Sequence, residues 1–127
     1  MQHFLGRGPQ HRCIIPASGY YEWKPTPTGK QPYYISARDG SILPFAGLWD
    51  EWHDPESGEQ VRSCTIIVTD ANALTRPIHD RMPVILIGAQ QTAWLASAAA
   101  ATELLRPAPC GRCHGGSIGL ATITIRS

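Results

Sequence analysis

The sequence predicts an α+β domain built on a curled antiparallel β-sheet with one or two helices, and three observations support this fold class. Short runs of β-branched and aromatic residues recur along the chain between turns that contain proline or glycine, a pattern typical of antiparallel strands. A single alanine-rich segment, residues 90–105, favours a helix. The length of 127 residues fits one domain that can bury a core.

The N-terminal part of the chain predicts four strands. Two are expected within residues 12–24, with a break at Pro16 and Gly19 between them. The third, residues 32–36, is expected to form a hairpin with the fourth, residues 42–49, through a polar turn.

The following segment predicts two more strands around a turn. A polar loop at residues 52–59 precedes residues 61–69, the most regular strand pattern in the chain. Asp70 is expected to cap a short helical turn. Residues 84–87 predict a buried strand, with Pro83 in its first position because no ladder donor is needed there. The residues expected in the core are Phe45, Ala46, Leu48, Trp49, Trp94, Leu95 and Leu104.

Residues 106–127 form a divergent tail rich in glycine and cysteine, in which residues 121–125 alternate as an edge strand does. Cys110, Cys113 and His114 match the pattern of c-type haem attachment, and the two cysteines could form half of a zinc site. Neither is favoured, because haem attachment requires export and residues 1–11 contain no export signal. No cofactor or metal is therefore expected.

Composition points to a cytoplasmic protein that is expected to be a monomer. Cys13 and Cys64 lie in apolar strands and are expected to be buried thiols in a reducing compartment. No apolar run approaches the length of a membrane span. The net charge of +1 excludes a global basic field, so any contact with nucleic acid must come from a local patch. The candidates for that patch are Arg7, Arg12, Lys24, Arg76 and Arg81.

The segment IHDRMPVIL, residues 78–86, is the strongest candidate for chemistry. His79 is expected on the turn that leads into a strand, which is a rigid position from which to direct a side chain. An imidazole beside Asp80 can move protons in either direction. The alternative is structural: Asp80 pairs with Arg81, and His79 caps the turn.

A second candidate is the aromatic run of residues 20–23. Alternation along a strand puts Tyr20 and Glu22 on one face and Tyr21 and Trp23 on the other. A carboxylate beside aromatic rings is partly desolvated, which suits it to hold or pass a proton. The alternative is a surface glutamate that pairs with Lys24.

Three ordered blocks carry a resemblance that covers about residues 12–105. They read RCIIPASGYYEWK, QPYYISARDGSILPFAGLWDEW and SCTIIVTDANALTRPIHDRMPVIL. Together they resemble the SOS response-associated peptidase (SRAP) family, whose members are also called abasic site processing proteins. The resemblance implies a barrel-like SRAP core and a role in the DNA damage (SOS) response.

The resemblance also implies a substrate and a chemistry. Members of the family act on abasic sites in single-stranded DNA as hydrolases (peptidases) and lyases. The α-amine and thiol of an N-terminal cysteine form a covalent protein–DNA linkage, a thiazolidine, with the sugar aldehyde.

The resemblance also implies roles for individual residues, according to their positions in the matching blocks. Glu22 matches the glutamate that assists Schiff-base formation, and His79 matches the general acid/base. Asp80 is expected to orient, and Arg81 is expected either to be structural or to bind a phosphate. The residues expected to contact DNA are Trp23, Lys24, Arg76 and Arg81.

The N-terminus departs from the family pattern Met-Cys-Gly-Arg, because Gln2 follows Met1. Residues 1–127 are therefore expected to form a single, N-terminally incomplete SRAP domain that makes no covalent DNA adduct. Two interpretations stay open. The chain handles abasic sites without that covalent step, or it is a degenerate, catalytically inactive remnant derived from a phage or transposon.

Overall fold

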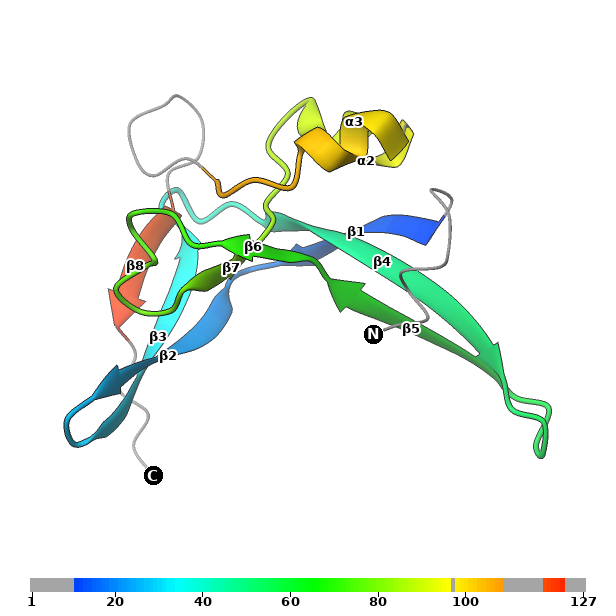
Figure 1. The fold of residues 1–127 in the computed structure, drawn as a ribbon, viewed down its shortest axis with the longest axis horizontal. Coiled ribbons are helices and arrows are strands. Elements are labelled where there is room, and N and C mark those ends of the chain that lie inside the picture. Colours follow the sequence, from blue (N-terminus) through cyan, green and yellow to red (C-terminus); the bar gives the residue numbers. More distant parts are fainter. Residues whose placement is uncertain (1–10, 97, 109–117, 123–127) are drawn as a thin grey trace.

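Antiparallel strands dominate the computed structural model, which describes residues 11–96, 98–108 and 118–122 (Figure 1). Two short helices lie near one end of the strands, and the fold is α+β as the sequence predicts. The described strands do not close into a barrel. The elements are β1 (Arg12–Ala17), β2 (Tyr20–Thr26), β3 (Gly29–Ala37), β4 (Leu43–His53), β5 (Gln60–Ile66), β6 (Val68–Asp70), β7 (Arg81–Pro83), α2 (Gln90–Ala96), α3 (Ala98–Glu103) and β8 (Ile118–Thr122).

The strands form three sheets. The first sheet has the order β1–β4–β5, the second β2–β3–β8, and the third is the pair β6–β7. In Figure 1 the first and second sheets diverge like the arms of an inverted V, with the third sheet near their meeting point.

The expected hairpin between β3 and β4 is wrong. β3 pairs with β2 and β8, whereas β4 pairs with β1 and β5. The reason is that both edges of β3 are already occupied, so the turn around Gly40 (φ 77°) carries the chain to another sheet. The chain also changes sheets between β1 and β2, where a Cβ on Gly19 would lie only 2.7 Å from the Ile35 carbonyl oxygen. The predicted break at Pro16 and Gly19 is therefore a corner between sheets.

The strand expected at residues 61–69 divides at Ile67 into β5 and β6. Three backbone hydrogen bonds form a ring at this point. The amide of Ala46 donates to the carbonyl of Val84, that of Ile67 to Ala46, and that of Val84 to Ile67, each over 2.9 Å. We call Ala46, Ile67 and Val84 the three-way junction. Pro83 is consequently the last residue of β7 rather than the first of a new strand, because the Val84 amide is needed for the junction.

The described residues form two hydrophobic cores. The first core lies between the second sheet, β4 and the segment that includes β7, and the second lies between the first sheet and the helices. The first core consists of Ile35, Ala37, Leu43, Phe45, Ile78, Met82, Ile85 and Ala108. The second consists of Ala46, Val84, Leu86, Trp94 and Ala101.

Most of the predicted core is confirmed, with two exceptions. Phe45, Ala46 and Trp94 are buried, and Leu48 and Leu104 pack against the second core. Leu95 is wrong, because its side chain follows Trp94 on the opposite side of a helix and is 52% exposed. Trp49 is only partly buried and lies against the ring of His11, with 4.7 Å between the ring centroids.

The helices are attached to β1 through Trp94. Its indole N–H donates to the Cys13 carbonyl over 2.9 Å, and the Arg12 guanidinium lies 5.7 Å from the ring centroid. The Arg12 Nε also donates to the Trp94 carbonyl. Arg12 therefore fastens α2 to β1, and its place in a DNA-binding patch stays a prediction.

The two cysteines of the first sheet differ in exposure. Cys13 is half-buried, and burial together with the nearby Cys64 raises the pKa of its thiol. Cys64 is exposed, contrary to the expectation, because within the described ranges β5 has a partner strand on one edge only and most of its residues are exposed.

The tail contributes an edge strand, as expected, although β8 begins three residues earlier than the predicted segment. It pairs with β3 from Ala37↔Ile118 to Tyr33↔Thr122. Cys110, Cys113 and His114 lie outside the described residues. No helix within the described ranges is long and apolar enough to cross a membrane.

Replacing Trp94 by alanine should lower the free energy of unfolding by about 3–5 kcal/mol, because a large buried side chain and its hydrogen bond are lost. Urea denaturation followed by circular dichroism measures the change. The matched control is Leu95→Ala on the same helix, which should change stability by less than about 0.5 kcal/mol. Equal losses in the two variants would contradict this packing of α2.

Candidate functional site

A turn of residues 71–80 connects β6 to β7 and carries the candidate residues of the IHDRMP segment. Asn72 organises it. Its side-chain oxygen accepts hydrogen bonds from the amides of Leu74 (3.1 Å) and Thr75 (3.0 Å) and from the Thr75 hydroxyl (3.1 Å). Its amide nitrogen donates to the carbonyl of Ala108 over 2.8 Å. Asn72 and Thr75 are both buried, so buried hydrogen bonds stabilise the turn.

Asp70 is not the cap that the sequence predicts; Asn72 has that role. Asp70 is the last residue of β6 and lies opposite Arg81 in the β6–β7 register. The Arg81 Nη1 donates to the Asp70 carboxylate over 2.9 Å. The alternative pairing of Arg81 with Asp80 is therefore wrong, because the register brings a different carboxylate to the guanidinium.

His79 lies where the turn enters β7, as predicted. Its amide donates to the Thr75 carbonyl over 3.0 Å, which fixes the backbone. The ring Nδ1 lies 3.2 Å from the Arg81 amide nitrogen and 3.4 Å from the Asp80 carboxylate. If Nδ1 accepts from that amide, a neutral ring carries its proton on Nε2. The side chain is 43% exposed, so this proton is available to a ligand.

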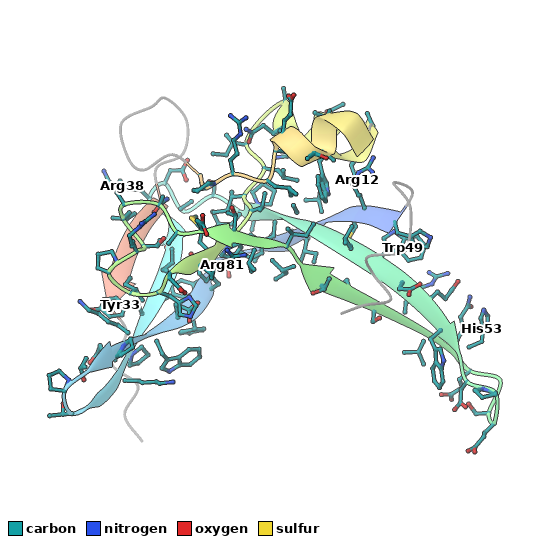
Figure 2. The ribbon with its side chains drawn as sticks, viewed as in Figure 1. Arg12, Tyr33, Arg38, Trp49, His53 and Arg81 are labelled. Atoms are coloured by element: carbon teal, nitrogen blue, oxygen red, sulfur yellow. The ribbon has the colours of Figure 1, made fainter. Side chains whose placement is uncertain are left out.

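The turn and its neighbouring strands form a charged cavity. Its volume is about 350 Å³, and its lining is Asp70, Arg76, Asp80 and Arg81. Arg76 is held in place by a hydrogen bond from Nη2 to the Ala71 carbonyl, 3.0 Å long. Two guanidinium groups thus share a cavity beside His79 with two carboxylates, whose formal negative charges equal their positive charges. Figure 2 shows Arg81 near the meeting point of the sheets.

The other predicted site residues lie on β2. Burial alternates along this strand, with Glu22 and Lys24 half-buried and Trp23 45% exposed, as the sequence predicts. Glu22 lies opposite Tyr33 in the register, and its carboxylate accepts a long hydrogen bond (3.3 Å) from the Trp23 amide. No ion pair joins Glu22 to Lys24 in the described chain, so the alternative of a surface pair is not supported.

The strand and the turn that carry the site residues, β2 and residues 71–80, both contribute side chains to the first core. Tyr20 and Tyr33 of the second sheet pack against the first core, which also contains Ile78 and Met82 on either side of the His79 segment. The described lining of the charged cavity includes Arg76 and Arg81 but none of the β2 residues. The structure therefore brings the two arginines together beside His79. That Glu22 and His79 act on one ligand stays a prediction.

Sequence reasoning missed Asn72 and the pairing of Asp70. An asparagine three residues before a threonine is a signal for a side-chain-capped turn and could have identified Asn72. Asp70 could be paired with Arg81 only once the register of β6 and β7 was known. Within the described part of the chain, no three His, Cys, Asp or Glu side chains gather as a metal site requires.

Comparison with protein families gives a match over most of the chain. The model described as SOS response associated peptidase (SRAP) matches residues 2–115. The abasic site processing protein YoqW of Bacillus subtilis is 47% identical over 85 residues, which are 66% of this chain and 38% of that protein. The abasic site processing protein HMCES of Xenopus tropicalis is 39% identical over 94 residues, covering 61% of this chain and 28% of that protein.

Solved structures agree with the sequence comparison. A protein from Bacteroides thetaiotaomicron superposes with a TM-score of 0.82 at 32% identity, over 97% of this chain and 56% of that one. A protein from Bordetella bronchiseptica gives a TM-score of 0.77 at 32% identity, over 91% and 56%. The chain thus spans less than two fifths of YoqW and a little over half of each of these solved structures.

Replacing Asn72 by alanine should lower the free energy of unfolding by about 1–3 kcal/mol, because buried amides and a carbonyl lose their partner. Denaturation curves report the loss. Asn72→Asp is the matched comparison, since it keeps the oxygen acceptor for the turn amides but removes the donor to Ala108. Compared with the alanine variant, Asn72→Asp should restore the order of the turn, which is measured by the hydrogen exchange of the His79 amide. It should not restore the full free energy of unfolding. An unperturbed alanine variant would refute the role of Asn72.

Proposed function

This chain belongs to the SOS response associated peptidase (SRAP) family, and we propose that it recognises abasic sites in single-stranded DNA during the response to DNA damage. Its relatives are named abasic site processing proteins, which makes DNA the expected partner. In this chain, the residues around the charged cavity are the proposed contacts with DNA.

The observation that carries the proposal is the cavity beside His79. Arg76 and Arg81 present two guanidinium groups in a space of about 350 Å³, which suits a phosphate of the DNA backbone. The net charge of the chain is only +1, so affinity has to come from such a local site. Asp70 holds Arg81 at 2.9 Å and therefore both orients this guanidinium and weakens its attraction for a phosphate.

Trp23 and Lys24 supply the second half of the proposed interface. Trp23 is 45% exposed, so part of its ring is open to a stacked base. Stacking on aromatic rings is tolerant of sequence and needs unpaired bases, which favours single strands over duplexes. Lys24, the next residue on β2, leaves the strand on the opposite face, the face of Glu22, and adds a positive charge there for the DNA backbone.

The proposed chemistry is proton transfer at the abasic sugar. His79 donates the Nε2 proton to an oxygen of the sugar as general acid, and the Glu22 carboxylate on β2 accepts the proton that is lost from the carbon next to the aldehyde. Loss of a proton beside the aldehyde starts elimination of the neighbouring phosphate and hence strand cleavage. The thiazolidine linkage of the family needs an amine and a thiol on one residue and is not part of this proposal.

The second candidate is an inactive remnant of the family. What favours it is the pairing of Arg81 with Asp70, which offsets the charge that DNA binding requires. The two functions differ in a simple observable, because a remnant shows neither selective DNA binding nor cleavage.

Arg81→Ala should weaken binding to single-stranded oligonucleotides and make the slope of log affinity against log salt shallower by about 0.7, the effect of one lost phosphate contact. Asp70→Asn should strengthen binding, because it releases the guanidinium from its ion pair. Fluorescence anisotropy with abasic, intact and duplex oligonucleotides over a salt series measures both changes.

The matched controls are Arg62→Ala and Glu51→Gln, which alter a similar ion pair of 3.0 Å on the first sheet. They should leave DNA binding unchanged. Equal effects at the two pairs would mean that binding is a nonspecific property of surface charge. No binding by the unaltered chain even at low salt would favour the remnant.

His79→Ala should reduce cleavage of an abasic strand by at least about tenfold, because general acid–base catalysis is lost. Binding should change little, since the cavity arginines remain. Cleavage of a labelled oligonucleotide is followed by denaturing electrophoresis. The control is His53→Ala, at the exposed end of β4, which should cleave like the unaltered chain. Undiminished cleavage by His79→Ala would remove this residue from the mechanism.

A further inference from the structure

The hydroxyl of Tyr20 is buried and has no hydrogen-bond partner among the described residues. Its ring is fixed in the first core, where it meets Phe45 edge to face with 5.8 Å between the ring centroids. A buried polar group without a partner is rare and calls for an explanation, because its desolvation is not compensated. The ring cannot move far, so a partner has to come to the hydroxyl.

Glu22 is the natural acceptor. It is two residues further along β2, so its side chain leaves the strand on the same face as that of Tyr20. The two groups are close enough that the charge of Glu22 adds to the effect of burial in raising the pKa of the Tyr20 hydroxyl. The hydroxyl therefore keeps its proton and remains a donor. Among the described residues, the Glu22 carboxylate is held only by a long hydrogen bond (3.3 Å) from the amide of Trp23.

We propose that Tyr20 is a positioning residue for Glu22. When the carboxylate turns toward the first core, the hydroxyl donates to it, which supplies the missing partner and fixes the orientation of the carboxylate. No bond is made or broken in this step. The use of the fixed carboxylate on an abasic sugar rests on the proposed function, but the pairing itself does not.

The other polar groups around Glu22 define the competing explanations. Tyr33 faces Glu22 from β3, and Lys24 follows on the same face of β2. From the turn, Ile78 packs in the first core, and His79 and Asp80 adjoin it. Tyr33 could hold the carboxylate instead of Tyr20. Alternatively, a buried water satisfies the Tyr20 hydroxyl, and Glu22 plays no part.

The experiment is nuclear magnetic resonance on the full chain with carbon-13 at Cζ of tyrosine, a position that senses hydrogen bonding of the hydroxyl. The sequence has four tyrosines, so substitution of each by phenylalanine assigns the signals. Glu22→Ala should shift the Tyr20 signal and leave that of Tyr34, whose hydroxyl is bonded to Ser18 on the other face (3.1 Å), in place. An unmoved Tyr20 signal, or a shift of Tyr33 alone, would overturn the proposal.

A mutant cycle tests the consequence for activity. Tyr20→Phe should lower cleavage of an abasic strand by about tenfold, the size of one hydrogen bond to a charged group. In a Glu22→Ala background the same change should have no further effect, and Tyr34→Phe is the matched control. Additive losses would overturn the positioning role. If the unaltered chain binds and cleaves no abasic DNA, the proposed function fails, and the resonance experiment alone decides the pairing.

Discussion

The arrangement of the sheets depends on the ring of three backbone hydrogen bonds that joins Ala46, Ile67 and Val84. Each residue donates to one partner and accepts from the other, so the three chain segments that contain these residues are joined at a single point. Ala46 and Val84 are completely buried, and water cannot substitute for a lost bond there. A strand that ran straight through Ile67 could not satisfy this ring. The division into β5 and β6 follows, and with it the direction in which β6 leaves the first sheet.

The position of the charged cavity is a consequence of that junction. β6 and β7 are only three residues long each, and the turn between them spans residues 71–80. Such a short pair would not hold its register alone. The junction fixes one end, and Asn72 with its bond to Ala108 fixes the other. The backbone that carries His79 and the two arginines is therefore fixed at both ends. Acid–base chemistry requires such a fixed position of the reacting side chain.

Local pattern was sufficient for most of the strands, but not for the division at Ile67, for the end of β7 at Pro83 or for the partners of strands and side chains. The strands β1 and β2, the break between them and the alternation of Glu22 and Trp23 follow from side-chain period and turn residues. The pairing of β3 with β8 rather than β4, and of Arg81 with Asp70 rather than Asp80, depends on contacts between distant segments. Leu95 was misplaced because an alanine-rich helix gives little periodicity from which to choose a buried face. The single expected helix at residues 90–105 is two short ones, α2 and α3.

The exposed edge of β5 has a practical meaning for handling the protein. Among the described strands, β5 is bonded on one side only, and Val61, Cys64 and Ile66 are exposed along it. An unpaired strand edge is a template for another chain, and an accessible thiol can lock two such chains together by oxidation. Arg62, whose side chain is 76% exposed, is the only charge on this strand that opposes stacking. During purification and storage, cross-linked aggregates should therefore begin at β5, and a reducing buffer protects the sample because it keeps the Cys64 thiol from forming a disulfide.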